Sequence, residues 1–154
     1  MNDQTIPLDY ANNLMYELEK AFWDERGKGA RFRLTTVGRG FFKDNVRPLL
    51  NTSDLDQILQ TIEDVLRQHG IASKMTYSSE ERLLRVKVES CVHRPVEEKM
   101  VAHGVEPFAC LPINLVVLAI EEIWDRPAEL AEVKIEEGYC QLLVVVFDKR
   151  PTLE

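Results

Sequence analysis

The apolar residues of this chain change their spacing near Gly70, and this change restricts the fold more than any other feature. Before Gly70 they recur every three or four positions, as on one face of an α-helix, whereas after it they alternate as in β-strands. The 154 residues are 45% hydrophobic, enough for one core. We therefore predict a single α+β domain over residues 1–154, with an antiparallel sheet packed against several helices.

Three helices are expected in the N-terminal half. The first is capped by Asp9 and ends at Gly27. Its apolar residues share one face: Tyr10, Leu14, Leu18, Ala21 and Phe22. The second covers about 32–50, where Gly38 and Gly40 weaken the helical pattern. Its predicted inward residues are Val37, Phe41, Phe42 and Val46. The third follows a capping-box-like sequence at 53–56 and ends at Gly70.

Strands dominate the rest of the chain. Alternation on both sides of a polar turn at 78–81 predicts a hairpin, and Arg94-Pro95 is expected to end its second strand. A loop to Pro107 should lead into an apolar helix over about 108–124, with Pro112 in its first turn. The last segment, 142–147, is apolar on both faces, which is typical of a central, covered strand.

Charge and cysteine content limit the class of protein. A net charge of −7 makes nucleic acid an unlikely partner, and the basic segment from Arg26 to Arg47 is either a solvated face or a small anion patch. The N-terminus resembles no secretory signal, and the longest apolar run is too short for a membrane span. We expect a cytoplasmic protein whose three cysteines are free thiols or metal ligands.

Four cysteine and histidine residues lie close together in the sequence and could form a zinc site. Cys91, His93, His103 and Cys110 would supply two thiolates and two imidazoles, a suitable tetrahedral set. Their spacing matches no standard zinc motif. The simpler interpretation is that both cysteines are buried and both histidines lie on surface loops. Cys140 is expected to be a core residue.

Cys110 has a second possible role because it stands at the expected start of the apolar helix. The positive end of a helix dipole lowers a thiol pKa, which would make Cys110 reactive. With His93 or His103 nearby, a thiol nucleophile or a redox-sensing thiol could result. No signature of a known catalytic family surrounds it.

The order of these elements resembles a known family over about residues 32–147. The resemblance rests on the glycine-bearing helix, His69-Gly70, the strand 85–90, Cys110 at the head of an apolar helix, and Gly138-Tyr139-Cys140. Together these features are similar to the 4-vinyl reductase or predicted hydrocarbon-binding domain, related in fold to subunits of the transport protein particle. The resemblance implies a dimer that holds a small, often apolar ligand. Fold alone does not determine function.

Three functions are consistent with the sequence. The first is a noncatalytic small-molecule-binding or sensory domain with a mostly apolar pocket, lined by Phe41, Phe108, Cys110 and Tyr139. The second is a dimeric protein–protein interaction module with a solid core. The third is a thiol- or metal-dependent enzyme, which needs Cys110 within hydrogen-bond reach of a histidine.

Overall fold

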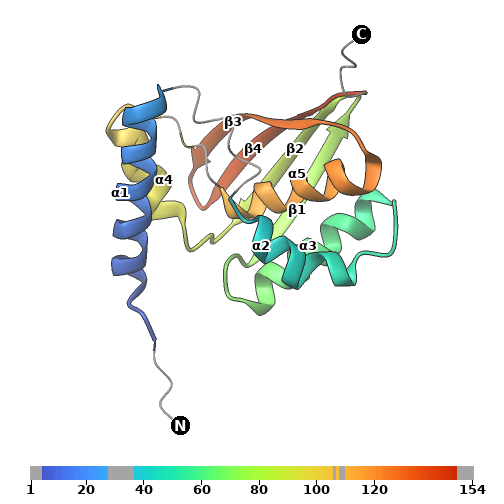
Figure 1. Ribbon diagram of the computed structural model, residues 1–154, viewed down its shortest axis with the longest axis horizontal. Coiled ribbons are helices and arrows are strands. Elements are labelled where there is room, and N and C mark those ends of the chain that lie inside the picture. The colour runs from blue at the N-terminus through green and yellow to red at the C-terminus, as the bar shows by residue number, and fades with distance from the viewer. Residues whose placement is uncertain (1–4, 28–36, 106, 108–109, 149–154) are drawn as a thin grey trace.

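A computed structural model describes residues 5–27, 37–105, 107 and 110–148. It contains one antiparallel sheet of four strands in the order β1-β2-β4-β3, with helices packed against one face (Figure 1). This arrangement confirms the predicted α+β class. Within the described residues, no helix is both long enough and apolar enough to cross a membrane.

The strands are β1 (Lys74–Glu80), β2 (Leu83–Glu89), β3 (Ala128–Glu136) and β4 (Tyr139–Val146). The predicted hairpin is confirmed, with Glu81 at a positive φ of 55° in its short turn. β4 lies between β2 and β3, so its central position is also confirmed. Only one of its faces is fully covered by other parts of the chain. Its buried residues are Cys140, Leu142, Val144 and Val146, whereas the alternate residues are only partly buried.

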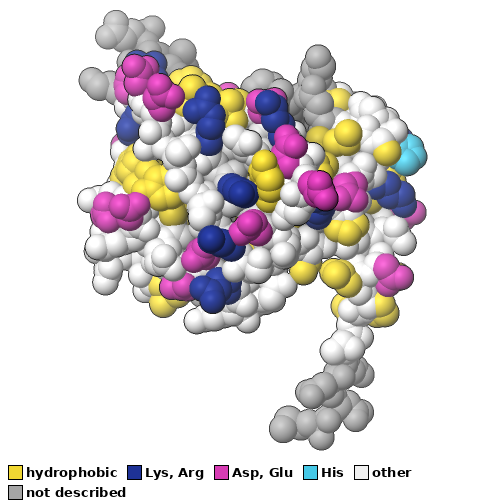
Figure 2. All heavy atoms as spheres, turned by 180° about the vertical axis from the view of Figure 1, so that it is seen from behind, with side chains coloured by type: hydrophobic (Ala, Val, Ile, Leu, Met, Phe, Trp, Pro, Cys, Tyr) yellow, Lys and Arg dark blue, Asp and Glu magenta, His cyan; other side chains and the backbone are white. Residues whose placement is uncertain are grey.

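The outer face of the sheet is largely polar. Strand register places Lys74, Glu89, Tyr139 and Glu136 side by side across all four strands. Basic and acidic side chains alternate over this face (Figure 2). Such a surface is stable in water, which explains how an antiparallel sheet can leave one side without helices.

Two helices cover the inner face of the sheet. α3 (Leu55–Gln68) matches the predicted third helix and buries its apolar side. Tyr77 of β1 donates a hydrogen bond to Asp56, and the expected capping hydrogen bond is not formed. α5 (Leu111–Trp124) has Pro112 in its first turn, as predicted, and buries every residue from Pro112 to Ile120.

The expected second helix is a series of short turns: α2 (Arg39–Phe41), the π-helical η2 (Phe42–Val46) and the 3₁₀-helical η3 (Arg47–Leu49). Its beginning, 28–36, lies outside the described residues. Phe42 and Val46 are buried as predicted, but Val37 is exposed. Gly38 has a φ of +90°, and a Cβ there would lie 2.7 Å from Leu111 Cδ1. Glycine therefore allows this segment to approach α5 closely.

One helix was not expected. α4 (Arg94–Ala102) occupies part of the predicted loop after the hairpin. Pro95 stands in its first turn, where proline is favourable, so Arg94-Pro95 starts a helix in addition to ending a strand. Val96 and Met100, four residues apart, are its buried apolar contacts.

α1 (Leu8–Arg26) lies at the edge of the molecule and packs beside α4 (Figure 1). The helix ends at Gly27, as predicted. Pro7 is its N-cap residue, whereas the side chain of Asp9 accepts a hydrogen bond from the N–H of Tyr10 within the first turn. Of the predicted apolar face, Tyr10, Leu14, Leu18 and Ala21 are exposed, whereas Phe22 is half-buried and packs against the core.

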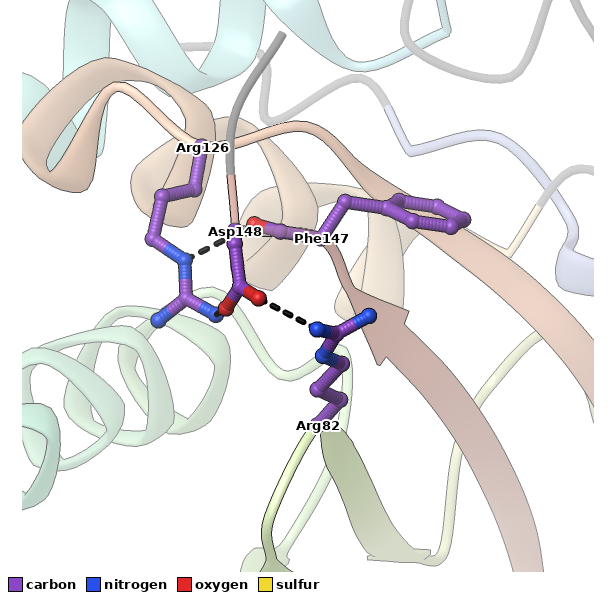
Figure 3. A network of polar contacts seen from close by, with 4 residues as sticks. All are labelled: Arg82, Arg126, Phe147 and Asp148. Atoms are coloured by element: carbon purple, nitrogen blue, oxygen red, sulfur yellow. Dashed lines mark hydrogen bonds and ion pairs between the residues drawn. The ribbon is translucent and has the colours of Figure 1, made fainter.

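A polar network fixes the end of β4 to the neighbouring chain segments (Figure 3). Arg126 donates from Nε to the carbonyl oxygen of Phe147 at 2.8 Å and contacts the Asp148 carboxylate at 3.2 Å. Arg82, from the turn of the hairpin, binds the same carboxylate. The two arginines therefore hold one end of the sheet together.

Candidate functional site

The three cysteines and one glutamate form a buried cluster. Cys91 follows β2, Glu97 lies in α4, Cys110 caps α5, and Cys140 lies in β4. Each is less than one tenth exposed, and Glu97 is only 4% exposed. We call this set the thiol–carboxyl cluster. Four separate elements therefore contribute to one site at the inner face of the sheet.

Glu97 is at the centre of the hydrogen bonding in the cluster. The Cys140 thiol donates to Glu97 Oε2 over 3.3 Å, and the Cys110 thiol is close enough to oppose part of the rise in the Glu97 pKa. Cys91 is close enough to interact electrostatically with Glu97 and with both other thiols. The buried carboxyl is thus satisfied by thiols, which are weak donors.

Burial disfavours charge throughout the cluster. It raises the pKa of Cys91 to about 11 and that of Cys140 to about 12, and it raises the Cys110 pKa well above its usual value. The Glu97 pKa is raised for the same reason. The expected lowering of the Cys110 pKa by the α5 dipole is therefore wrong, because desolvation of the thiolate outweighs the helix terminus.

The two histidines have other contacts. His93 Nδ1 lies 3.4 Å from Asn12 Oδ1 in α1, and burial lowers its pKa. His103 follows α4, where its Nδ1 is 2.8 Å from the Lys99 carbonyl oxygen and its ring lies against Tyr16. The structure therefore brings Cys91 and Cys110 together but leaves His103 on the surface.

No three or more His, Cys, Asp or Glu side chains in the described part of the chain are positioned, as they stand, to hold a metal ion. The zinc site expected from the sequence stays a prediction. The thiol–carboxyl cluster contains two of its four residues, Cys91 and Cys110.

The residues expected to line an apolar pocket are dispersed. Phe41 is half-buried beside His69, with 5.1 Å between ring centroids, while Cys110 belongs to the thiol–carboxyl cluster. Tyr139 lies on the outer face of the sheet, in a hollow of about 280 Å³, with Lys87 Nζ 4.2 Å from its ring centre. Phe108 lies outside the described residues.

A larger hollow of about 380 Å³ lies between α1 and α4. Its walls include Leu8, Tyr16, Pro95 and Val96, and Lys99 adds a positive charge. The Lys99 ammonium lies 4.6 Å from the centre of the Tyr16 ring. No sequence pattern indicated this hollow, because α4 was expected to be a loop.

Comparison with solved structures reveals a similar fold. The chain resembles the phenol-responsive sensory domain of the transcription activator PoxR, whose crystal structure contains phenol, with a TM-score of 0.57 and 13% identity. The match covers 95% of this chain and 77% of that one. No model of a protein family matches the sequence, and no curated protein matches it. At this identity the likeness establishes the fold alone.

The position of Glu97 among the three thiols is the feature of the site that the sequence does not predict. Glutamate is rarely buried, so the residue type alone provides no reason to place Glu97 beside three thiols. Its position in the first turn of a proline-started helix is the one available signal, because acidic residues favour helix N-termini.

Proposed function

We propose that this chain is a noncatalytic sensory domain that binds a small molecule. The observation that supports the proposal is the similarity in fold to a domain that responds to phenol. The chemistry of the thiol–carboxyl cluster also argues against an enzyme, because a buried thiol with a raised pKa is a poor nucleophile. The resemblance to the 4-vinyl reductase family fits the same function and stays a prediction.

The proposed ligand is small and mostly apolar, and it binds on the helical side of the sheet. Phe41 and Cys110 remain its proposed contacts, because both belong to elements on that side. Tyr139 is less suitable because its side chain lies on the opposite face, near Lys87.

Calorimetric titration with phenol tests this assignment. We expect saturable binding to the wild-type protein and at least a tenfold weaker affinity for Phe41→Ala. Val101→Ala removes an exposed apolar side chain elsewhere and should bind phenol as the wild type does. Native mass spectrometry of protein purified without a tag should also detect a bound organic mass. A ligand-free protein that binds neither phenol nor other small aromatics would favour the interaction module.

The zinc set expected from the sequence, Cys91, His93, His103 and Cys110, stays a proposal, and we propose the thiol–carboxyl cluster as an alternative set. Three thiolates and one carboxylate are suitable zinc ligands. A bound zinc ion would favour the deprotonated thiols and carboxylate, which burial disfavours in its absence. In the described structure these side chains are not placed to bind one metal ion together, so they must rotate toward a common point. Cys91, Glu97, Cys110 and Cys140 would hold the ion, which would join four elements of the fold.

Elemental analysis with matched variants tests the zinc assignment. We expect one zinc per chain in the wild type and in His103→Ala, and loss of zinc in Cys110→Ser. Zinc lost from His103→Ala but kept by Cys140→Ser would instead favour the original set of two cysteines and two histidines. Protein that cannot take up zinc after refolding in its presence would exclude both sets.

A further inference from the structure

A hollow of about 380 Å³ lies between α1 and α4, and we call it the α1–α4 hollow. Its volume is within the range of pockets that bind small molecules. Tyr16 of α1 and Val96 of α4 line it, and these two side chains are only 6% and 2% exposed. Both also pack in the hydrophobic core. The apolar wall of the hollow is therefore supported by the core of the protein.

Contacts at both ends of α4 hold the two helices together. Before α4, the Val92 carbonyl oxygen accepts a hydrogen bond from Asn12 Nδ2 of α1 over 3.0 Å. After α4, the centre of the His103 ring lies 5.6 Å from the centre of the Tyr16 ring. Figure 1 shows the two helices side by side at the edge of the molecule. The α1–α4 hollow is therefore formed before any ligand binds, which lowers the entropic cost of binding.

Lys99 places a positive charge at the wall of the α1–α4 hollow. Its ammonium group donates to Asn13 Oδ1 over 3.3 Å and lies 4.6 Å from the centre of the Tyr16 ring. Both contacts are with neutral groups. Within the described part of the chain, none of the ion pairs involves Lys99. The ammonium group is therefore held in place by neutral contacts and can bind an anionic group.

Asp9 also lines the α1–α4 hollow, but in a different part of it from Lys99. It lies in the first turn of α1, whereas the two residues that contact Lys99, Asn13 and Tyr16, lie about 6 and 10 Å farther along the helix. Its carboxylate accepts a hydrogen bond from the N–H of Tyr10 at 2.9 Å. A ligand with one negative charge therefore has one favourable orientation, with that charge beside Lys99 and away from Asp9.

We propose that the α1–α4 hollow binds a small aromatic carboxylate. The carboxylate pairs with the Lys99 ammonium, and the ring packs against Tyr16 and Val96. Phosphate fits less well, because most of the wall is apolar and offers few donors for its several charged oxygens. A neutral aromatic such as phenol buries the same apolar surface without pairing with Lys99. The site is distinct from the proposed phenol site beside Phe41 and Cys110.

Calorimetric titration of the full chain with benzoate tests the proposal. We expect saturable binding to the wild type and at least about tenfold weaker binding to Lys99→Met, which keeps an apolar side chain but loses the charge. Lys99→Arg restores the charge and should recover most of the affinity. Lys87→Met is the matched control and should bind benzoate as the wild type does. Lys87 also lies over a tyrosine ring, 4.2 Å from the centre of Tyr139, but on the outer face of the sheet.

Benzyl alcohol is the matched uncharged ligand and should bind to the wild type at least about tenfold more weakly than benzoate. This comparison needs no variant, so it decides the question even if Lys99→Met does not fold. Phe41→Ala should leave benzoate binding unchanged, which separates this site from the proposed phenol site.

Nuclear magnetic resonance locates the bound benzoate. Its addition should change the amide chemical shifts of residues 8–16 and 95–99, which line the α1–α4 hollow. Shift changes confined to the sheet would overturn the proposal. The absence of saturable benzoate binding, full affinity in folded Lys99→Met, or benzyl alcohol bound as tightly as benzoate would each overturn it as well.

Discussion

Replacing Glu97 with glutamine should remove a pH-dependent part of the protein's stability. The carboxyl is 4% exposed, and burial raises its pKa above the ordinary value of 4.5. A carboxyl with a raised folded-state pKa holds its proton more tightly when folded. Its contribution to stability is therefore fully present below about pH 4.5 and is lost as the pH rises through the folded-state pKa.

The size of the effect follows from proton linkage. Between the unfolded and folded pKa values, one proton is released on unfolding, and the free energy of unfolding falls by up to about 1.4 kcal/mol per pH unit. Glu97→Gln keeps an oxygen acceptor for the Cys140 thiol but cannot ionise. The stability of the variant relative to wild type should therefore increase with pH across this interval and then level off.

Urea denaturation of chelator-treated protein from pH 4.5 to 8 measures this difference. Burial lowers the pKa of His93, which opposes the Glu97 effect, but it contributes equally to both proteins and cancels in the comparison. Glu98→Gln is the matched control, because Glu98 is the exposed neighbour that pairs with Arg94 at 2.6 Å. Identical pH dependence in wild type and Glu97→Gln would refute the argument that burial raises the pKa of this carboxyl.

Three further predictions follow from other contacts. Gly38→Ala should lower the free energy of unfolding by about 1–3 kcal/mol, because its positive φ disfavours alanine and the new Cβ would meet Leu111; urea denaturation measures this loss. Cys110 should resist iodoacetamide at pH 8 in the folded protein and react after unfolding, as mass spectrometry can establish. Asp148→Asn breaks the contact with Arg82, but the pair is exposed, so the loss should stay below about 1 kcal/mol by the same denaturation assay.

The fold could be predicted where local pattern and tertiary environment agree. The third helix was predicted from helical spacing and its glycine end, and Leu55–Gln68 is helical with its apolar side buried. The alternation around 78–81 predicts the two strands of the hairpin, and the alternating apolar residues Val86 and Val88 are both buried. In these segments the apolar face and the covered face coincide.

In α1 and α4, the local sequence pattern does not predict the tertiary environment of the residues. The spacing of Tyr10, Leu14 and Leu18 correctly predicts a helix, but spacing identifies an apolar side and not what covers it. At α4 the dipeptide Arg94-Pro95 was interpreted as a strand end, although proline also favours the first turn of a helix. Without this helix the burial of Glu97 could not be predicted, since the thiol–carboxyl cluster exists only when α4 turns that residue inward.

Asn12 connects α1 to the residues that follow Cys91 of the thiol–carboxyl cluster. Its amide donates to the Val92 carbonyl oxygen, and its oxygen lies 3.4 Å from His93 Nδ1, so α1 holds both residues that follow Cys91. A shift of Cys91 must either carry α1 with it or break these contacts. The opposite side of the same helix carries the exposed residues Tyr10, Leu14 and Leu18. A buried polar residue on an outlying helix is otherwise costly, and here it provides the direct contact between that helix and the chain beside the thiol–carboxyl cluster.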